Sequence, residues 1–137
     1  MIWECVLPGV PGVKGNSKRI LRVRGRTIVA SSAKDKAKEN AAAYHIRRAR
    51  PAVMFDGPVH VDVWFHFAIP KSKEGKVNIG DPRWQRPDME NMIKMLHDAM
   101  NGVVWNDDAQ VASLFANKVW ADLNETVVKV RSVVDGV

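Results

Sequence analysis

The chain has 137 residues, with 46% apolar and 26% charged side chains and a formal net charge of +6. This length suits one domain that buries its own core, and neither repeats nor an internal boundary interrupt the sequence. No apolar run approaches the roughly 20 residues of a membrane span, and the N-terminus lacks the basic and apolar stretches of a signal peptide. We therefore expect a single cytoplasmic domain over residues 1–137. The single cysteine, Cys5, excludes an internal disulfide and a thiolate metal site.

Basic charge is concentrated in the first part of the chain. Residues 1–50 hold twelve Lys or Arg against three acidic residues, a net charge of +9. Such asymmetry indicates a polyanionic partner. Nucleic acid is favoured over a membrane surface, because no segment combines its charges with a strong apolar face.

The N-terminal third predicts strands followed by a helix. Residues 2–6 alternate between apolar and polar side chains, as in a strand. Residues 19–31 predict two short strands joined at a glycine, with Arg22, Arg24 and Arg26 at every second position. In a strand that spacing places all three on one face. This face is either a solvated hairpin surface or one that follows a phosphate backbone.

Residues 31–50 predict a helix, which begins at a serine cap and ends before a proline. Its small apolar side chains fall on one stripe that predicts a narrow packing face, formed by Ala33, Ala37, Ala41 and Tyr44.

Residues 59–69 give the clearest strand pattern, because apolar side chains occupy every second position without a break. The opposite face carries a mixed set that a second layer or a second subunit would cover: His60, Asp62, Trp64 and His66. The two histidines are about 20 Å apart along a strand, too far to share a metal ion. We expect both to be structural.

A long basic loop follows over residues 70–86, with five Lys or Arg and no periodicity. Loops of this length inside a compact domain are uncommon and tend to be functional or disordered. Trp84 either packs this loop down or stacks on a nucleic-acid base. Residues 110–121 and 125–134 again alternate as strands, so the whole order predicts an α/β (α+β) domain with a mixed sheet and two helices.

Residues 88–108 reverse the charge of the chain. They hold five acidic residues and one basic residue, so the segment carries −4 while the other 116 residues carry +10. Like charges brought together repel and raise each other's pKa unless a cation lies between them. Asp88 fits a helix N-cap and Gly102 fits the position after the helix end, which predicts a helix between them. Its expected core face comprises Met92, Ile93, Met95, Leu96, Ala99 and Met100.

Two interpretations of this helix remain open. One is an ordinary amphipathic helix with a solvated polar face and a Lys94–Asp98 surface pair. The other is a metal site: the tight turn before the next strand would return Asp107 or Asp108 to the helix start, beside Asp88. Carboxylate oxygens in such a cluster suit Mg²⁺ or Mn²⁺. Lys94 would then neutralise charge on a phosphoryl group.

The same residues resemble the signature of the RusA family of Holliday junction resolvases. Its usual form is R/K-x-D-x-D-N-x-x-K, then D-A/G-L/M, then W-x-D-D-x-Q-V. Here residues 86–91 read RPDMEN, Lys94 and the pair Asp98-Ala99 follow, and residues 105–111 read WNDDAQV. The Pro-rich loop that ends at Asn16-Ser17, with the strand and helix after it, is similar to the opening of the family. The resemblance thus covers nearly the whole chain.

The resemblance implies a RusA-like fold and a homodimeric, Mg²⁺-dependent endonuclease of phage or prophage type, in which Mn²⁺ can substitute. Such an enzyme cuts four-way DNA junctions during recombination and repair, and needs no nucleotide cofactor. The positions carried over are Asp88, Glu90 and Asp108 as metal ligands and Lys94 as the catalytic lysine. One departure is Glu90, where the family usually has Asp; glutamate keeps the charge but reaches one methylene further.

The expected reaction is phosphodiester hydrolysis, in which a metal ion activates water and Lys94 stabilises the added charge. Two alternatives are a non-catalytic junction-binding protein and a nuclease for other branched DNA. We expect basic side chains of the N-terminal part and of loop 70–86 to contact DNA, namely Lys14, Lys18, Arg19, Arg22, Arg24, Arg26, Lys71, Lys73, Lys76, Arg83 and Arg86.

Overall fold

A computed structural model describes residues 1–13, 18–31 and 33–134, and gives the side chains of all these except 18–23, 26–31 and 33. Its elements follow the order expected from the sequence. They are β1 (Ile2–Pro8), β2 (Lys18–Val23), β3 (Arg26–Ser31), α1 (Ala33–Arg48), β4 (Val59–Ala68), α2 (Met89–Met100), β5 (Val111–Ala121) and β6 (Glu125–Ser132), with short 3-10 turns η1 (Lys71–Lys73) and η2 (Asp108–Gln110).

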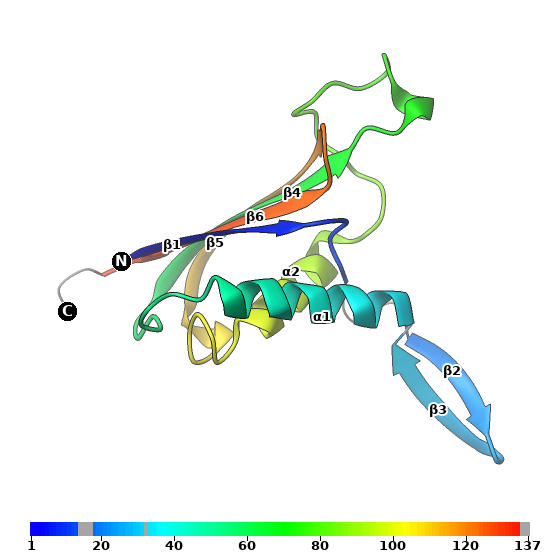
Figure 1. Cartoon of the computed structure of the whole chain (residues 1–137), viewed down its shortest axis with the longest axis horizontal. Coiled ribbons are helices and arrows are strands. Elements are labelled where there is room, and N and C mark those ends of the chain that lie inside the picture. Colours follow the sequence, from blue (N-terminus) through cyan, green and yellow to red (C-terminus); the bar gives the residue numbers. More distant parts are fainter. Residues whose placement is uncertain (14–17, 32, 135–137) are drawn as a thin grey trace.

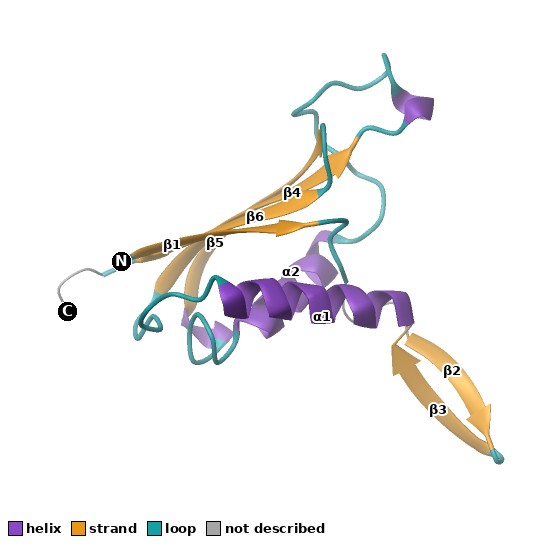
Figure 2. Ribbon diagram, viewed as in Figure 1, coloured by secondary structure: helices purple, strands orange, loops and turns teal. Residues whose placement is uncertain are grey.

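A mixed sheet with the strand order β1-β6-β4-β5 forms the body of the molecule. The β1–β6 and β6–β4 pairs are antiparallel, whereas β4 and β5 are parallel. Both helices lie against one face of this sheet, as Figure 1 and Figure 2 show. The predicted single domain with a mixed sheet and two helices is confirmed.

The core lies between the sheet and the helices. Alternate residues of β4 point into it and are fully buried, as the unbroken alternation predicts. Helix α2 covers them with Met92, Leu96 and Met100, which are also fully buried. Cys5 of β1 is a small buried side chain, and burial raises the pKa of its thiol. Within the described residues, no helix is long and apolar enough to cross a membrane.

Helix α1 packs through a different stripe from the one expected. Its buried residues are Ala42 and Ile46, one turn apart, whereas the ring of Tyr44 is 53% exposed. Tyr44 instead accepts a hydrogen bond from Arg48 on the helix surface. The expectation was wrong because a helix with so few large apolar residues has no dominant stripe, so contacts with α2 and β1 choose the buried face.

The β2–β3 hairpin projects away from the sheet and helices (Figure 1). Its turn contains Arg24 and Gly25, whose φ angles are 52° and 76°. The turn therefore falls between Arg22 and Arg26, which lie in different strands. The predicted hairpin is confirmed, but the prediction of three arginines along one strand was wrong.

His97 of α2 is buried, although it lies outside the apolar face predicted for this helix. Its ring packs edge-on against Trp105, with ring centroids 5.3 Å apart. Its Nε2 atom is buried without a hydrogen-bond partner among the described residues. Burial lowers the pKa of His97, against the opposing effects of Asp108 and Asp98.

The buried ring predicts acid sensitivity. The folded state favours neutral His97, while the unfolded chain binds a proton near the ordinary pKa of 6.5. The free energy of unfolding should therefore fall as the pH drops below that value. His97→Phe should reduce this loss, as measured by denaturant midpoints between pH 7.5 and 5. An identical pH dependence in the variant and the wild type would contradict this origin.

Candidate active site

A half-buried cation anchors the start of α2 to the sheet. Lys118 of β5 donates hydrogen bonds from Nζ to the carbonyl oxygens of Gln85 and Pro87. Burial lowers the pKa of this lysine, the nearby Arg83 lowers it further, and Asp88 acts in the opposite direction. The lysine therefore fixes the backbone that leads into α2 and places a positive charge close to Asp88.

Arg83 holds the same segment from the other side. Its guanidinium lies over the ring of Phe67, 3.9 Å from the centroid, and also near Trp120. Its Nη1 donates to the carbonyl oxygens of Gln85 and Arg86 at 3.1 and 2.8 Å. Burial lowers the pKa of Arg83. We therefore assign this arginine to positioning the loop, because the ring of Phe67 and two carbonyl oxygens already engage its guanidinium.

Three of the predicted site residues lie on the first half of α2. Asp88 is the N-cap residue, but its side chain does not cap the helix. Instead, Asn91 Nδ2 lies 3.5 Å from Asp88 Oδ2. Glu90 and Lys94 are exposed and one turn apart, so both reach solvent on the same side of the helix.

Asp108 lies beyond the other end of α2. Asn101, the C-cap residue, receives a 2.6 Å hydrogen bond from Trp105 Nε1 at its side-chain oxygen. Its Nδ2 lies 3.4 Å from Asp108 Oδ2. Trp105 is fully buried, so the core fixes Asn101, and Asn101 in turn orients Asp108. Sequence reasoning missed Asn101, although its place before Gly102 marks it as a helix-end residue.

Asp107 has a structural role. Its side chain caps η2 by accepting from Ala109 N, while the Gln110 side chain accepts from the backbone of Asn106 and Asp107. The same glutamine amide donates to the carbonyl oxygens of Phe55 and Gly57. The turn is thereby tied to the segment before β4. Position in the turn left Asp107 and Asp108 as equal candidates and the family resemblance selected Asp108; the capping role of Asp107 agrees with that selection.

The acidic residues therefore fall into two groups separated by a helix. Twelve helical residues at 1.5 Å each span about 18 Å, which separates Asp88 from the Asn101–Asp108 contact. No three His, Cys, Asp or Glu side chains among the described residues come close enough to hold a metal ion. The expectation that the turn returns Asp108 to the helix start is wrong for one chain.

Comparison with known proteins supplies the family. The family model of the endodeoxyribonuclease RusA matches residues 8–131. The chain belongs to the RusA family. A Bacillus subtilis (strain 168) protein, the uncharacterized protein YqaN, is 30% identical over 132 residues, covering 91% of this chain and 92% of that protein. Membership confirms the resemblance drawn from the acidic motif and implies endodeoxyribonuclease activity.

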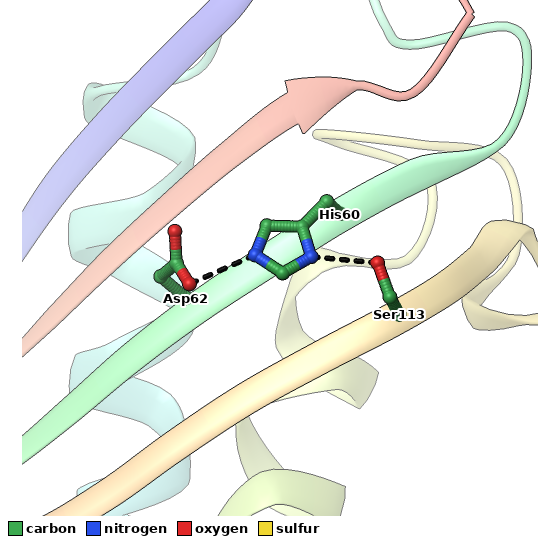
Figure 3. Close-up of polar contacts among 3 residues, drawn as sticks. All are labelled: His60, Asp62 and Ser113. Atoms are coloured by element: carbon green, nitrogen blue, oxygen red, sulfur yellow. Dashed lines mark hydrogen bonds and ion pairs between the residues drawn. The ribbon is translucent and has the colours of Figure 1, made fainter.

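A second polar cluster lies on the open face of the sheet (Figure 3). His60 contacts Ser113 Oγ through Nδ1 at 2.6 Å and Asp62 Oδ1 through Nε2 at 2.8 Å. These residue types also form hydrolase triads, but such sites need N–H donors that converge on an oxyanion. Here the residues lie on extended strands, whose N–H groups alternate in direction. The cluster instead links β4 to β5.

The other histidine of β4 also has a partner, because His66 Nδ1 lies 3.3 Å from Glu125 Oε1. The two histidines thus have the structural roles expected of them. Trp64 lies between them and is half-buried. This face was the candidate subunit surface, and its polar side chains are already paired within the chain.

The predicted DNA-binding residues fall into three groups. Lys14 lies outside the described residues, and only the backbone is described for four others in the hairpin: Lys18, Arg19, Arg22 and Arg26. Arg24 is exposed at the hairpin turn. In loop 70–86 the structure exposes Lys71, Lys76 and Arg86, whereas Lys73 is half-buried with its Nζ 6.0 Å from the centroid of the Trp120 ring.

The anchor predicts a local effect of Lys118→Met. The change leaves two carbonyl groups without their charged donor, which should destabilise the fold by about 1–3 kcal/mol. Amide exchange at Arg83 should also become faster, since its N–H bonds to the Lys118 carbonyl beside the lost contact. Lys129→Met, at a half-exposed position of β6, is the matched control. Equal stability and exchange in both variants would show that Lys118 does not anchor the loop.

Proposed function

We propose that this chain is a Mg²⁺-dependent endonuclease that resolves four-way DNA junctions by hydrolysing one phosphodiester in each of two opposed strands. The observation that carries the proposal is the exposed set Asp88, Glu90 and Lys94 on α2, in a member of the RusA family. Lys118 and Arg83, the two half-buried cations that bind the backbone before α2, hold the start of this helix in place. Exposed basic residues of loop 70–86 and of the hairpin turn supply contacts for the DNA backbone.

The donor atoms suit the metal, but one chain does not assemble them. Asp88, Glu90 and Asp108 offer only carboxylate oxygens, the ligands that Mg²⁺ and Mn²⁺ prefer. Asp108 is separated from the other two by the length of α2. If α2 of a second protomer ran in the opposite direction, Asp108 of that protomer would lie near Asp88 of the first protomer. We propose that each metal site is shared by two protomers of a homodimer.

The free edge of β5 supports this arrangement. Loop 78–83 covers only the end of the strand, through backbone bonds to Lys118 and Trp120. Lys118 and Trp120 bond to this loop through backbone groups that point away from β4. Backbone groups alternate in direction along a strand, so those of Leu114 and Ala116 also point away from β4. Residues 111–117 carry no charge or proline, which commonly protect strand edges. Leu114 and Phe115 are 42% and 52% exposed.

Pairing this edge with itself joins the separated carboxylates. In an antiparallel pair centred on Leu114, Val111 of one protomer lies opposite Asn117 of the other. Asp108 lies three residues before Val111. In this register, Asp108 of the second protomer therefore lies beside the C-terminal end of β5 of the first protomer. Lys118 reaches Pro87 from that end and lies beside Asp88. The two-fold pair therefore forms two equivalent sites, as symmetric cutting requires.

The roles of the side chains follow from this assembly. Asp88 and Glu90 of one protomer, with Asp108 of the other, would hold Mg²⁺, which activates water and stabilises charge on the phosphate. Lys94, one turn from Glu90, contacts the same phosphate and stabilises charge that develops in the transition state. Asn101 and Lys118 orient the two halves of the site. The strand is expected to be cut to leave a 5′-phosphate.

The test of function is cutting of a mobile four-way junction by the purified protein with Mg²⁺. We expect cuts in both opposed strands, faster than in three-way or flap substrates. Faster cutting of flaps would favour a nuclease for other branched DNA. Tight junction binding without metal-dependent cutting would favour a non-catalytic binding protein.

The proposed ligands make a specific prediction. Asp88→Asn and Asp108→Asn should each lower the cutting rate by more than about 100-fold, because each removes a metal ligand. Both should still bind the junction, since the basic surface is unchanged. Glu90→Asp should keep activity, because it restores the usual residue of the family, whereas Glu90→Gln should lose it. Full activity in Glu90→Gln would remove Glu90 from the site.

The proposed interface predicts that Leu114→Lys gives monomers. A charge on each of two directly paired strands repels the other and blocks strand addition. Sedimentation should give twice the 15.3 kDa chain mass for the wild type and a single chain mass for the variant. Val6→Lys, at a 51% exposed position of the opposite edge strand β1, should remain dimeric. A dimeric Leu114→Lys protein would place the interface elsewhere.

A further inference from the structure

Trp84 is the most exposed tryptophan among the described residues. Its side chain is 84% exposed, whereas Trp3, Trp105 and Trp120 are each no more than 7% exposed. The sequence is compatible with a Trp84 side chain that packs against the loop and with one that is exposed for stacking on a base. The structure shows that it reaches outward, so the loop is held by other residues.

The backbone around Trp84 is fixed although its ring is not buried. Arg83 on one side stacks on Phe67 and donates across the turn to the carbonyl oxygens of Gln85 and Arg86. Lys118 donates to the carbonyl oxygen of Gln85 from below. Trp84 is therefore an exposed ring on a backbone segment that two half-buried cations hold in place. A ring presented in this way loses little backbone entropy when it binds a ligand.

We propose that Trp84 is a stacking site for an unpaired nucleobase at the branch point of the DNA. This inference rests on the proposed function and adds a residue that the acidic site does not include. Aromatic rings bind unstacked bases by stacking, without regard to sequence. The same loop carries three exposed cations that can hold phosphates, Lys71, Lys76 and Arg86. This charge favours a nucleic acid over an apolar protein surface as the ligand.

The spacing along the chain links the ring to the scissile phosphate. Asp88 lies four positions after Trp84, so their Cα atoms are at most about 14 Å apart. Bases along one DNA strand are stacked 3.4 Å apart, so this reach is about four base steps. A base held on Trp84 thus lies within a few nucleotides of the phosphate at the carboxylates. Trp84 would select sites where bases are unpaired, which a continuous duplex lacks.

Trp84→Ala tests this role in EDTA, where no strand is cut. The variant should bind a four-way junction roughly 5- to 150-fold more weakly, the range for one lost base stack. Its affinity for a continuous duplex, and the slope of binding against salt, should not change, because no phosphate contact is lost. Trp84→Phe should retain most of the junction affinity. Ile79→Ala, at a 68% exposed position of the same loop, is the matched control and should bind like the wild type.

Cross-linking then locates the contact. A junction with 5-iodouracil at the branch point, irradiated with the wild type, should give a cross-link at residue 84 by peptide mass spectrometry. Cross-linking only at other residues, or equal junction affinity in Trp84→Ala, would overturn the stacking site while leaving the nuclease proposal intact. A cross-link at Trp84 in a protein that cuts no branched substrate with Mg²⁺ would support the stacking site and overturn the nuclease proposal.

Discussion

The clamp formed by Lys118 and Arg83 is the interaction on which the rest of the site depends. Two long, half-buried cationic side chains, one from β5 and one from loop 70–86 itself, bind the carbonyl oxygens of residues 85–87. The loop would otherwise be a basic segment without a core of its own. Because the clamp ends immediately before Asp88, it sets where α2 begins and which way its first turn faces. It also leaves Trp84 exposed at a fixed position.

Helix α2 then acts as a spacer of defined length. Met92, Leu96 and Met100 are fully buried against the sheet and fix the helix in place, and the length of the helix keeps its two ends apart. Asp88 lies at one end, and the core residue Trp105 fixes Asn101 and Asp108 at the other. Repulsion among the acidic residues, which the sequence led us to expect, is thus relieved by distance within one chain. In the proposed dimer, a cation would relieve it between chains.

The sequence predicted the fold well because its strongest patterns are local. Unbroken alternation in β4 and capping residues around α2 each follow from a few neighbouring side chains, and the structure agrees with both. Two of the predictions that were wrong depended on distant contacts. Ala42 and Ile46 are buried because α2 and β1 lie against them, and His97 is buried because Trp105 returns beneath it.

The site could be predicted only in part for the same reason. The spacing of Asp88, Glu90 and Lys94 within one helix is local, and the structure keeps it. The path from α2 to β5 is not local: the link Trp105–Asn101–Asp108 holds the chain at the helix end instead of returning it to the start. The roles of Arg83 and Lys118 were also hidden, because a basic residue in a basic loop or on an edge strand predicts solvent exposure.

The measurement that tests the shared site most directly uses a mixed dimer. Co-expression of Asp88→Asn and Asp108→Asn chains with different affinity tags allows the heterodimer to be purified. If the ligands come from two protomers, one of its two sites combines both defects and the other is intact. The heterodimer should then nick one strand of the junction at about half the wild-type rate, although each parent variant is inactive. An inactive heterodimer would show that Asp88 and Asp108 act within one chain, which would contradict the account.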